Sequence, residues 1–231
     1  MTDYLLFIDT EASGLPKKWH LPYATPGNWP HAVQISWLVY TRAGEKIKEA
    51  NYFINNTDFI VSAKAFAVHG LSADYLKVNG IDRSQVLHQL TADLSFYQPT
   101  IIGHFTLFDY RIIGAEYHRV NQINLMEQLP TFCIMKATQH LQLNPNSKYL
   151  RLGDLYELLF KQSLSNQHNA LVDATATANC YFELVKKNKL AAYAQPPIVF
   201  HLKQKIPAGL ALGIALLLVL CSVLIMAFHH G

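Results

Sequence analysis

Two carboxylates near the start of the chain have a spacing that suits metal chemistry. Asp9 and Glu11 directly follow an apolar run at residues 4–8, which is typical of a strand buried on both faces. Side chains two residues apart in a strand point to the same side, so both acids would share one place. Two like charges about 4 Å apart repel by about 4 kcal/mol at an effective dielectric of roughly 20, unless a proton or a cation intervenes. We therefore expect a divalent cation site or, as the plainer alternative, a solvated strand end.

Further along the chain, two more patterns place acids near expected helix starts. Asp109 follows a predicted short strand at residues 100–104 and lies inside the start of a helix, where it would face the ends of neighbouring strands or simply stabilise the first helical turn. His168 and Asp173 are separated by about 140° on a continuous helix, so they converge only if His168 lies in the preceding loop. Asn169 can cap the helix and so make that break. Each pattern alone is also an ordinary structural feature.

Taken in order, these patterns resemble the motifs of the DEDDh branch of the DnaQ-like 3'-to-5' exonucleases. The motifs are the runs at residues 7–16, 108–109 and 168–174. The resemblance spans roughly residues 4–187, and residues 68–72 are similar to the stretch that helps to seat the terminal nucleotide in this family. The sequence departs from many relatives at Phe105, which stands where they have Asn after a histidine. We therefore expect one polar contact near the site to differ, while the metal ligands are retained.

The resemblance implies a catalytic role for five residues. Two Mg²⁺ or Mn²⁺ ions would be held by Asp9, Glu11, Asp109 and Asp173, and such a pair of ions can stabilise both the attacking and the leaving oxygen at phosphorus. His168 would be the general base, because an imidazole, which ordinarily titrates near pH ~6.5, can take a proton from water. Turnover is then expected to rise between about pH 6 and 8.

The same resemblance implies a substrate-binding site formed by Leu15, Pro16, Val68 and His69. The apolar side chains would flank the terminal base without reading its sequence, because every base has a π-face. A proline-rich connection at residues 15–32 carries three aromatic residues that would either stack on a nucleotide upstream of the cleaved bond or cover the core, namely Trp19, Tyr23 and Trp29. The basic residues that could contact phosphates, or stay solvated, are Lys17, Lys18, Lys148 and Arg151.

Apolar patterning predicts an α/β fold around these residues. Runs rich in β-branched and aromatic residues at 33–40 and 47–54 flank a turn and predict a hairpin. Helices are predicted at residues 83–97, 107–120, 152–161 and 170–187. Strands first, then strands interleaved with helices, indicate a mixed sheet covered on both faces. The resemblance implies, more narrowly, an RNase H-like (DnaQ-type) mixed sheet flanked by helices on both faces, as an exonuclease domain over residues 1–190.

Residues 206–228 form an uncharged apolar segment. At about 1.5 Å per residue they make roughly 34 Å of helix against about 30 Å of hydrocarbon, so we predict one C-terminal transmembrane helix after a linker at 191–205; a buried core helix is the weaker alternative. Lysines precede the segment and three uncharged residues follow it, which predicts a single-pass tail anchor with the nuclease domain facing the cytoplasm. Gly209 and Gly213 form a GxxxG motif that could pair two copies as a homodimer.

Composition restricts the class of protein further. The chain of 231 residues is 51% hydrophobic and 12% aromatic, with a formal net charge of +3, so it can bury a core and is not disordered. Its three cysteines lack paired spacing, which argues against a Cys-based zinc site, and its first residues lack the basic leader of a secretory signal. We expect a membrane-tethered, metal-dependent 3'-to-5' exonuclease that acts on DNA 3' ends and releases nucleoside monophosphates. The alternatives are an exoribonuclease of the same family, a catalytically silent membrane-bound nucleic-acid-binding module, and a proofreading subunit of a polymerase.

Overall fold

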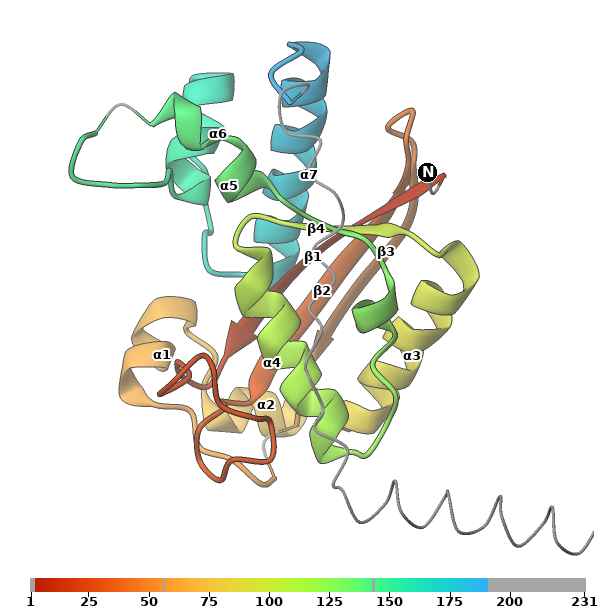
Figure 1. The fold of residues 1–231 in the computed structure, drawn as a ribbon. Helices are drawn as coiled ribbons and strands as arrows, with labels where there is room; N and C mark the ends of the chain where they lie inside the picture. Colours follow the sequence, from red (N-terminus) through yellow and green to blue (C-terminus); the bar gives the residue numbers. More distant parts are fainter. Residues whose placement is uncertain (1–2, 56, 143, 191–231) are drawn as a thin grey trace, which may run out of the picture. The chain divides into compact units, whose positions relative to one another are not determined.

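A mixed five-stranded sheet forms the centre of the molecule. The computed structural model describes residues 3–55, 57–142 and 144–190. The strand order is β3-β2-β1-β4-β5, with β1 antiparallel to β2, β2 antiparallel to β3, and β4 parallel to both β1 and β5 (Figure 1). The strands are β1 (Tyr4–Ala12), β2 (Ala32–Thr41), β3 (Lys46–Phe53), β4 (Thr100–Gly103) and β5 (Thr131–Cys133).

Helices fill the connections after the hairpin. The longer ones are α3 (Arg83–Tyr97), α4 (Thr106–Arg119), α6 (Leu152–Phe160) and α7 (Ala170–Lys186). The shorter ones are α1 (Ala63–His69), α2 (Ala73–Asn79) and α5 (Ile134–Ala137), with single 3-10 turns at Leu125–Gln128 and Gln139–Leu141. Side-chain caps explain several of the starts, since Asp82 accepts from the Ser84 N–H at 2.8 Å before α3, and Ser62 and Ser72 do the same before α1 and α2.

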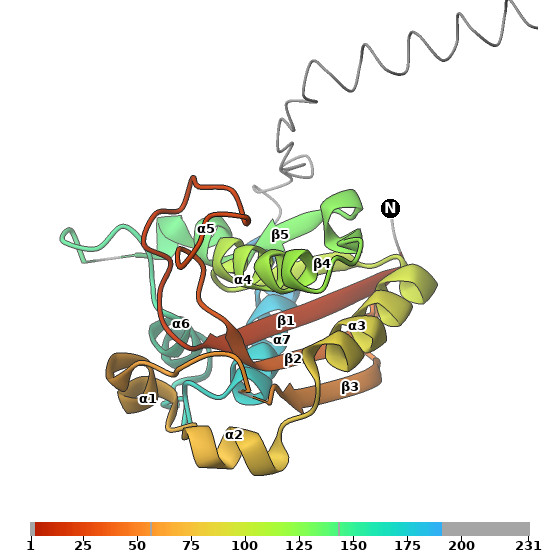
Figure 2. The ribbon, with the colours of Figure 1, turned by 90° about the horizontal axis from the view of Figure 1, so that it is seen from below.

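Alternate residues of the sheet pack against different helices. Leu5, Phe7 and Leu38 belong to one buried cluster with side chains of α6 and α7. Trp37, the neighbour of Leu38, points to the other face and donates its indole N–H to Asp93 of α3 at 2.7 Å. The sheet therefore lies between α7 on one face and α3 with α4 on the other (Figure 2). Because Asp9 and Glu11 have the same parity as Phe7, they continue the α7-facing row beyond the core.

Most predicted elements are present, with one informative shift. The hairpin, the strand at 100–104 and the four longer helices lie within a residue or two of their expected positions. The first strand, expected at 4–8, continues to Ala12, because Asp9 and Glu11 keep pairing with Ser36 and Gln34 of β2. α1, α2, α5 and β5 were not predicted.

Among the described residues, no helix combines the length and apolar character that crossing a bilayer requires. The predicted linker at 191–205 and the predicted transmembrane helix at 206–228 lie outside the described residues.

Candidate active site

Asp9 and Glu11 project from the part of β1 that β4 does not reach. The parallel pairing with β4 stops at Phe7, opposite Ile102, while the antiparallel pairing with β2 continues to Ala12. One side of the Asp9 to Glu11 stretch is therefore open to other elements. Glu11 is 8% exposed and Asp9 is partly buried. Neither is therefore a solvated acid at the end of a strand, which was the alternative to a cation site.

Asp109 reaches this open side from the first turn of α4. β4 ends at Gly103, and α4 begins three residues later, so the helix starts beside the gap in the sheet. The hydroxyl of Thr10 donates to the Asp109 carboxylate at 2.9 Å and fixes its position. An added Cβ at Gly103 would come within 3.3 Å of Asp109 Oδ2 and 3.0 Å of Thr106 Oγ1, so a residue without a side chain suits this close approach.

His168 lies in the loop before α7, as predicted, and Asn169 caps the helix. The Asn169 side chain accepts from the N–H groups of Leu171 and Val172 at 3.1 and 3.3 Å. His168 adopts a left-handed backbone conformation with φ of 64°, which costs a non-glycine residue roughly 1 kcal/mol. This turn directs the His168 N–H to Asp173 Oδ2 at 3.0 Å, so the histidine and the acid share one corner.

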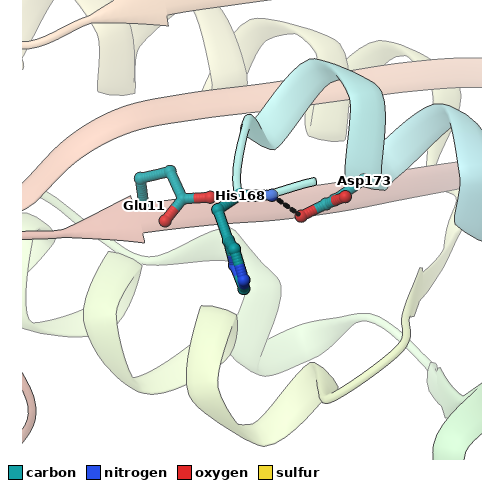
Figure 3. Close-up of side chains that lie close together, drawn as sticks. All are labelled: Glu11, His168 and Asp173. Carbon is teal, nitrogen blue, oxygen red and sulfur yellow. Dashed lines mark hydrogen bonds between the residues drawn. The ribbon is translucent and has the colours of Figure 1, made fainter. Parts of the chain in front are cut away.

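Three of these side chains come close enough to bind one ion. Ligand atoms of Glu11, His168 and Asp173 all lie within 4.8 Å of one another. Figure 3 shows the backbone of His168 between Glu11 of β1 and Asp173 of α7, with its imidazole ring pointing away from the line that joins the two carboxylates. Asp173 Oδ1 is buried without a hydrogen-bond partner, which leaves one carboxylate oxygen with an unused lone pair at this place.

The four acids repel one another electrostatically. Burial raises the pKa of Asp9 well above its ordinary value, and repulsion from Asp109, Asp173 and Glu11 raises it further. Burial and the charges of Asp173 and Asp109 raise the pKa of Glu11 to about 8. Burial raises the pKa of Asp109 to about 7 although the Thr10 hydrogen bond opposes the rise. The pKa of Asp173 is also raised by burial, against the effect of the His168 N–H. Bringing the acids together is therefore unfavourable without a bound proton or cation.

A pocket of about 440 Å³ opens beside Glu11. Its wall is mostly apolar and includes three of the four residues proposed to bind substrate, Leu15, Val68 and His69. Pro16 is buried and does not line the pocket. Leu15 and Val68 are 76% and 53% exposed, so their side chains are free to contact a ligand.

The predicted phosphate-contacting residues are exposed but not all near this pocket. Lys17, Lys18, Lys148 and Arg151 are each solvent-accessible, and Lys148 lies over the Tyr149 ring with 5.2 Å between Nζ and the ring centroid. The basic residue that does line the pocket is Lys64 of α1, together with Phe108 of α4. Neither was predicted.

Thr10 and Gln34 also support the site, and neither residue was predicted from the sequence. Thr10 lies between Asp9 and Glu11 in β1, and its side chain points to the opposite face of the sheet. Strand alternation of period two could have predicted that orientation, and the hydroxyl bonds Asp109 of α4 on that face. Gln34 lies across from Glu11 in the β1–β2 pairing and binds the start of α7. No local pattern marks a buried glutamine as a support for a helix that begins 136 residues later.

The fold is similar to that of solved exonuclease structures. No protein-family model and no curated protein matches the sequence. Among solved structures, E. coli exonuclease I in complex with a dT13 oligonucleotide aligns with a TM-score of 0.67 and 16% identity, over 83% of this chain and 43% of that one. A 3'-exonuclease that recognises the histone mRNA stem-loop aligns with a TM-score of 0.62 and 12% identity, over 80% of this chain and 83% of that one. The nuclease domain of 3'hExo, a DEDDh family member bound to rAMP, aligns with 0.63 and 12% identity, over 82% and 94%.

The chain thus shares the fold of these exonucleases, and the predicted mixed sheet flanked by helices is confirmed. It spans less than half the length of exonuclease I.

Proposed function

We propose that this protein is a metal-dependent 3'-to-5' exonuclease of the DEDDh type. The observation that carries the proposal is the meeting of Glu11, His168 and Asp173 within 4.8 Å, beside Asp9 and Asp109, in a fold shared with exonucleases. Structural ion-pair networks also perturb pKa values, but this cluster holds four carboxylates and no Lys or Arg contributes to the shifts found for them.

The donor set fits hard divalent cations. Carboxylate oxygens are the ligands that Mg²⁺ and Mn²⁺ prefer, and the unpartnered Asp173 Oδ1 offers one directly. The residues that would hold two such ions are Asp9, Glu11, Asp109 and Asp173. When bound, two ions would supply charge stabilisation for the attacking and leaving oxygens of phosphodiester hydrolysis.

His168 would take the proton of the attacking water. Its side chain is exposed on a loop that the Asn169 cap and the bond to Asp173 hold in place, so the imidazole can reach both solvent and the acids. At saturating metal we expect wild-type turnover to rise between about pH 6 and 8, and His168→Ala to lose about 10²- to 10⁴-fold in kcat with oligonucleotide binding retained. A flat pH profile with chemistry rate-limiting would count against this role.

The apolar pocket beside Glu11 would hold the 3'-terminal nucleotide. Leu15 and Val68 would contact the base, His69 would contribute the polar part of the same wall, and Pro16, which is buried, would help to form the loop that carries Leu15. Apolar contacts of this kind accept any base, so we expect little sequence preference and release of nucleoside monophosphates.

The test uses the full chain, purified in mild detergent, and a 5'-labelled oligonucleotide with Mg²⁺, Mn²⁺ or chelator. We expect a ladder that shortens stepwise from the 3' end and disappears with chelator or with Asp9→Asn. Asp74→Asn, which changes an exposed acid of α2, should leave the ladder intact. Binding without any shortening would favour the alternative of a catalytically silent binding module.

We expect DNA as the preferred substrate, with RNA as the alternative. The aligned structures include one with a dT13 oligonucleotide and one that recognises an mRNA stem-loop, so the shared fold accommodates both kinds of ligand in those proteins. Matched DNA and RNA oligonucleotides, degraded in parallel under one set of conditions, decide the preference.

The membrane tether belongs to the same proposal and rests on sequence alone. The apolar, uncharged segment at 206–228 supports a transmembrane helix, the preceding lysines support a cytoplasmic nuclease domain, and Gly209 with Gly213 supports helix pairing into a dimer. Alkaline extraction of membranes from expressing cells should leave the protein in the pellet. Its release into the supernatant would contradict the tether while leaving the nuclease proposal unaffected.

A further inference from the structure

Three aromatic rings, two of them exposed and the third half-buried, lie together at the start of α4. The rings of Phe105 and Phe108 are nearly parallel, with centroids 6.3 Å apart and planes 22° apart. Trp19 packs against both, at 5.9 Å from Phe105 and 6.2 Å from Phe108. Trp19 is 37% exposed and Phe105 is 40% exposed, so their ring surfaces remain open to solvent.

The other aromatic residues of the same loop cover the core. Trp29 is 4% exposed and donates its indole N–H to the Pro22 carbonyl at 3.2 Å. The Tyr23 ring lies 5.4 Å from Trp29 and packs on α4 at Gly114. Trp29 also meets the Trp19 ring edge-on, with centroids 6.5 Å apart. Trp19 thus has a different role from the other two, since much of its ring faces water.

The exposed rings are continuous with the proposed nucleotide pocket. Phe108 lines that pocket together with Leu15 and Val68, and the same Phe108 ring packs against Phe105 and Trp19. Lys17 and Lys18 directly precede Trp19 in the loop and are exposed, and Lys64 lines the pocket itself. An aromatic surface flanked by basic side chains is the arrangement that binds single-stranded nucleic acid.

We propose that Trp19 and Phe105 form a stacking platform for the base next to the 3'-terminal nucleotide. The inference rests on the proposed nuclease function and narrows its substrate class. Withdrawing a paired base from a duplex to stack it on protein rings costs free energy, so we expect the enzyme to prefer 3' ends with at least two unpaired nucleotides. Single strands and 3' overhangs would be substrates, and blunt duplex ends would be poor ones.

The first experiment measures KM and kcat of the full chain on a 5'-labelled single strand. Trp19→Ala and Phe105→Ala should each raise KM about 5- to 150-fold with little change in kcat, the range expected for loss of base stacking. Trp19→Phe and Phe105→Tyr keep a ring and should remain close to wild type. Phe96→Ala, which removes a 79% exposed ring on α3, is the matched control and should change nothing.

A second experiment removes the base instead of the ring. For the wild type, an oligonucleotide that lacks the base at the penultimate position should have a KM higher by about the same factor. For Trp19→Ala, which already lacks the ring, removal of this base should raise KM little further. Loss of a base far upstream should affect both proteins equally. A nucleoside monophosphate, which fills only the pocket, should inhibit wild type and Trp19→Ala equally.

The two proposals fail in different ways. An active enzyme whose KM is unchanged by Trp19→Ala and Phe105→Ala, or whose sensitivity to the missing base survives in Trp19→Ala, overturns the platform and leaves the nuclease intact. A wild-type chain that degrades no oligonucleotide overturns the nuclease proposal and the platform with it.

Discussion

The side-chain oxygen of Gln34 accepts a hydrogen bond of 3.1 Å from the backbone N–H of Ala170, the first residue of α7. Gln34 lies directly across from Glu11 in the β1–β2 pairing, and its amide also donates to Asn51 at 2.8 Å. One fully buried side chain of β2, the strand paired with the acid-carrying β1, therefore binds the start of the helix that carries Asp173. The spacing between the two halves of the candidate site depends on this link.

Replacing Gln34 by Ala should separate these halves. The Ala170 N–H would lose its partner in a buried place, which costs about 1–3 kcal/mol in the free energy of unfolding. We also expect kcat to fall about tenfold or more, because a small misplacement of Asp173 weakens every interaction made in the transition state. Denaturant unfolding and single-turnover assays check both effects. Gln85→Ala, at an exposed position of α3, should be neutral; equal behaviour of the two variants would contradict the proposed link.

Thr10→Val tests how the sheet tunes Asp109. The hydroxyl of Thr10 lowers the pKa of Asp109 through its 2.9 Å hydrogen bond, although burial still raises that pKa to about 7. Valine keeps the shape and removes the donor, so the pKa should rise further and fewer Asp109 side chains would be ionised at neutral pH. At limiting Mg²⁺ we expect kcat/KM to fall about tenfold at pH 7 and to recover towards pH 9.

Thr10→Ser, which restores a donor, should keep the wild-type profile. A Thr10→Val enzyme whose loss of activity is the same at every pH would show that the residue matters only for packing.

Sequence patterns predicted the elements whose signals are local. α3 begins at Arg83 and ends at Tyr97 as expected, because Asp82 caps its start and the apolar residues repeat at helical spacing. α1 escaped detection because none of its residues is buried, so no apolar stripe marks it. β5 is only three residues long, and its place is set by parallel pairing with β4 rather than by its own composition.

For the candidate site, the acids could be identified but their supports could not. The order of the acidic motifs along the chain carries the resemblance to exonucleases, so Asp9, Glu11, Asp109 and Asp173 were found together. Thr10 bonds a residue 99 positions away, and Gln34 bonds one 136 positions away. Such contacts form only in the folded chain, so no local pattern predicts them. The same holds for Phe108, whose part in the pocket follows from how α4 is placed beside β1.

Gly114→Ala should loosen the aromatic loop. A Cβ at Gly114 would meet the Tyr23 hydroxyl and lie 2.7 Å from Tyr23 Cζ, so the ring and its loop would have to move. Alanine is otherwise favoured over glycine inside a helix, so any loss of stability reports this clash. We expect a loss of about 1–3 kcal/mol in the free energy of unfolding and a change in tryptophan fluorescence from Trp19 and Trp29. In a Tyr23→Ala background, which lacks the ring, Gly114→Ala should no longer lower the free energy of unfolding. A Gly114→Ala variant more stable than wild type would contradict the close packing.

The carboxylate cluster predicts an unusual pH dependence of stability without metal. Burial and mutual repulsion raise the pKa of Glu11 to about 8, and burial raises that of Asp109 to about 7, both well above the values expected in the unfolded chain. The folded protein therefore binds more protons than the unfolded one, and stability is lost as the pH rises through the folded pKa values. His31 and His104 have the opposite shift, since burial lowers the pKa of each to about 4, but their contribution is complete above pH ~6.5.

Between about pH 6.5 and 8.5, the unfolding temperature of the chelator-treated protein should thus fall by about 5 °C or more. Saturating Mg²⁺ or Mn²⁺ should remove most of this fall, because a cation replaces the protons between the acids. Asp9→Asn takes one negative charge out of the cluster, so it should raise the metal-free unfolding temperature at pH 8.5, flatten its slope and weaken the response to metal. Thermal scans across this pH range, with and without metal, make the measurement. A metal-free unfolding temperature that stays constant or increases towards pH 8.5 would show that the four carboxylates do not share one buried site.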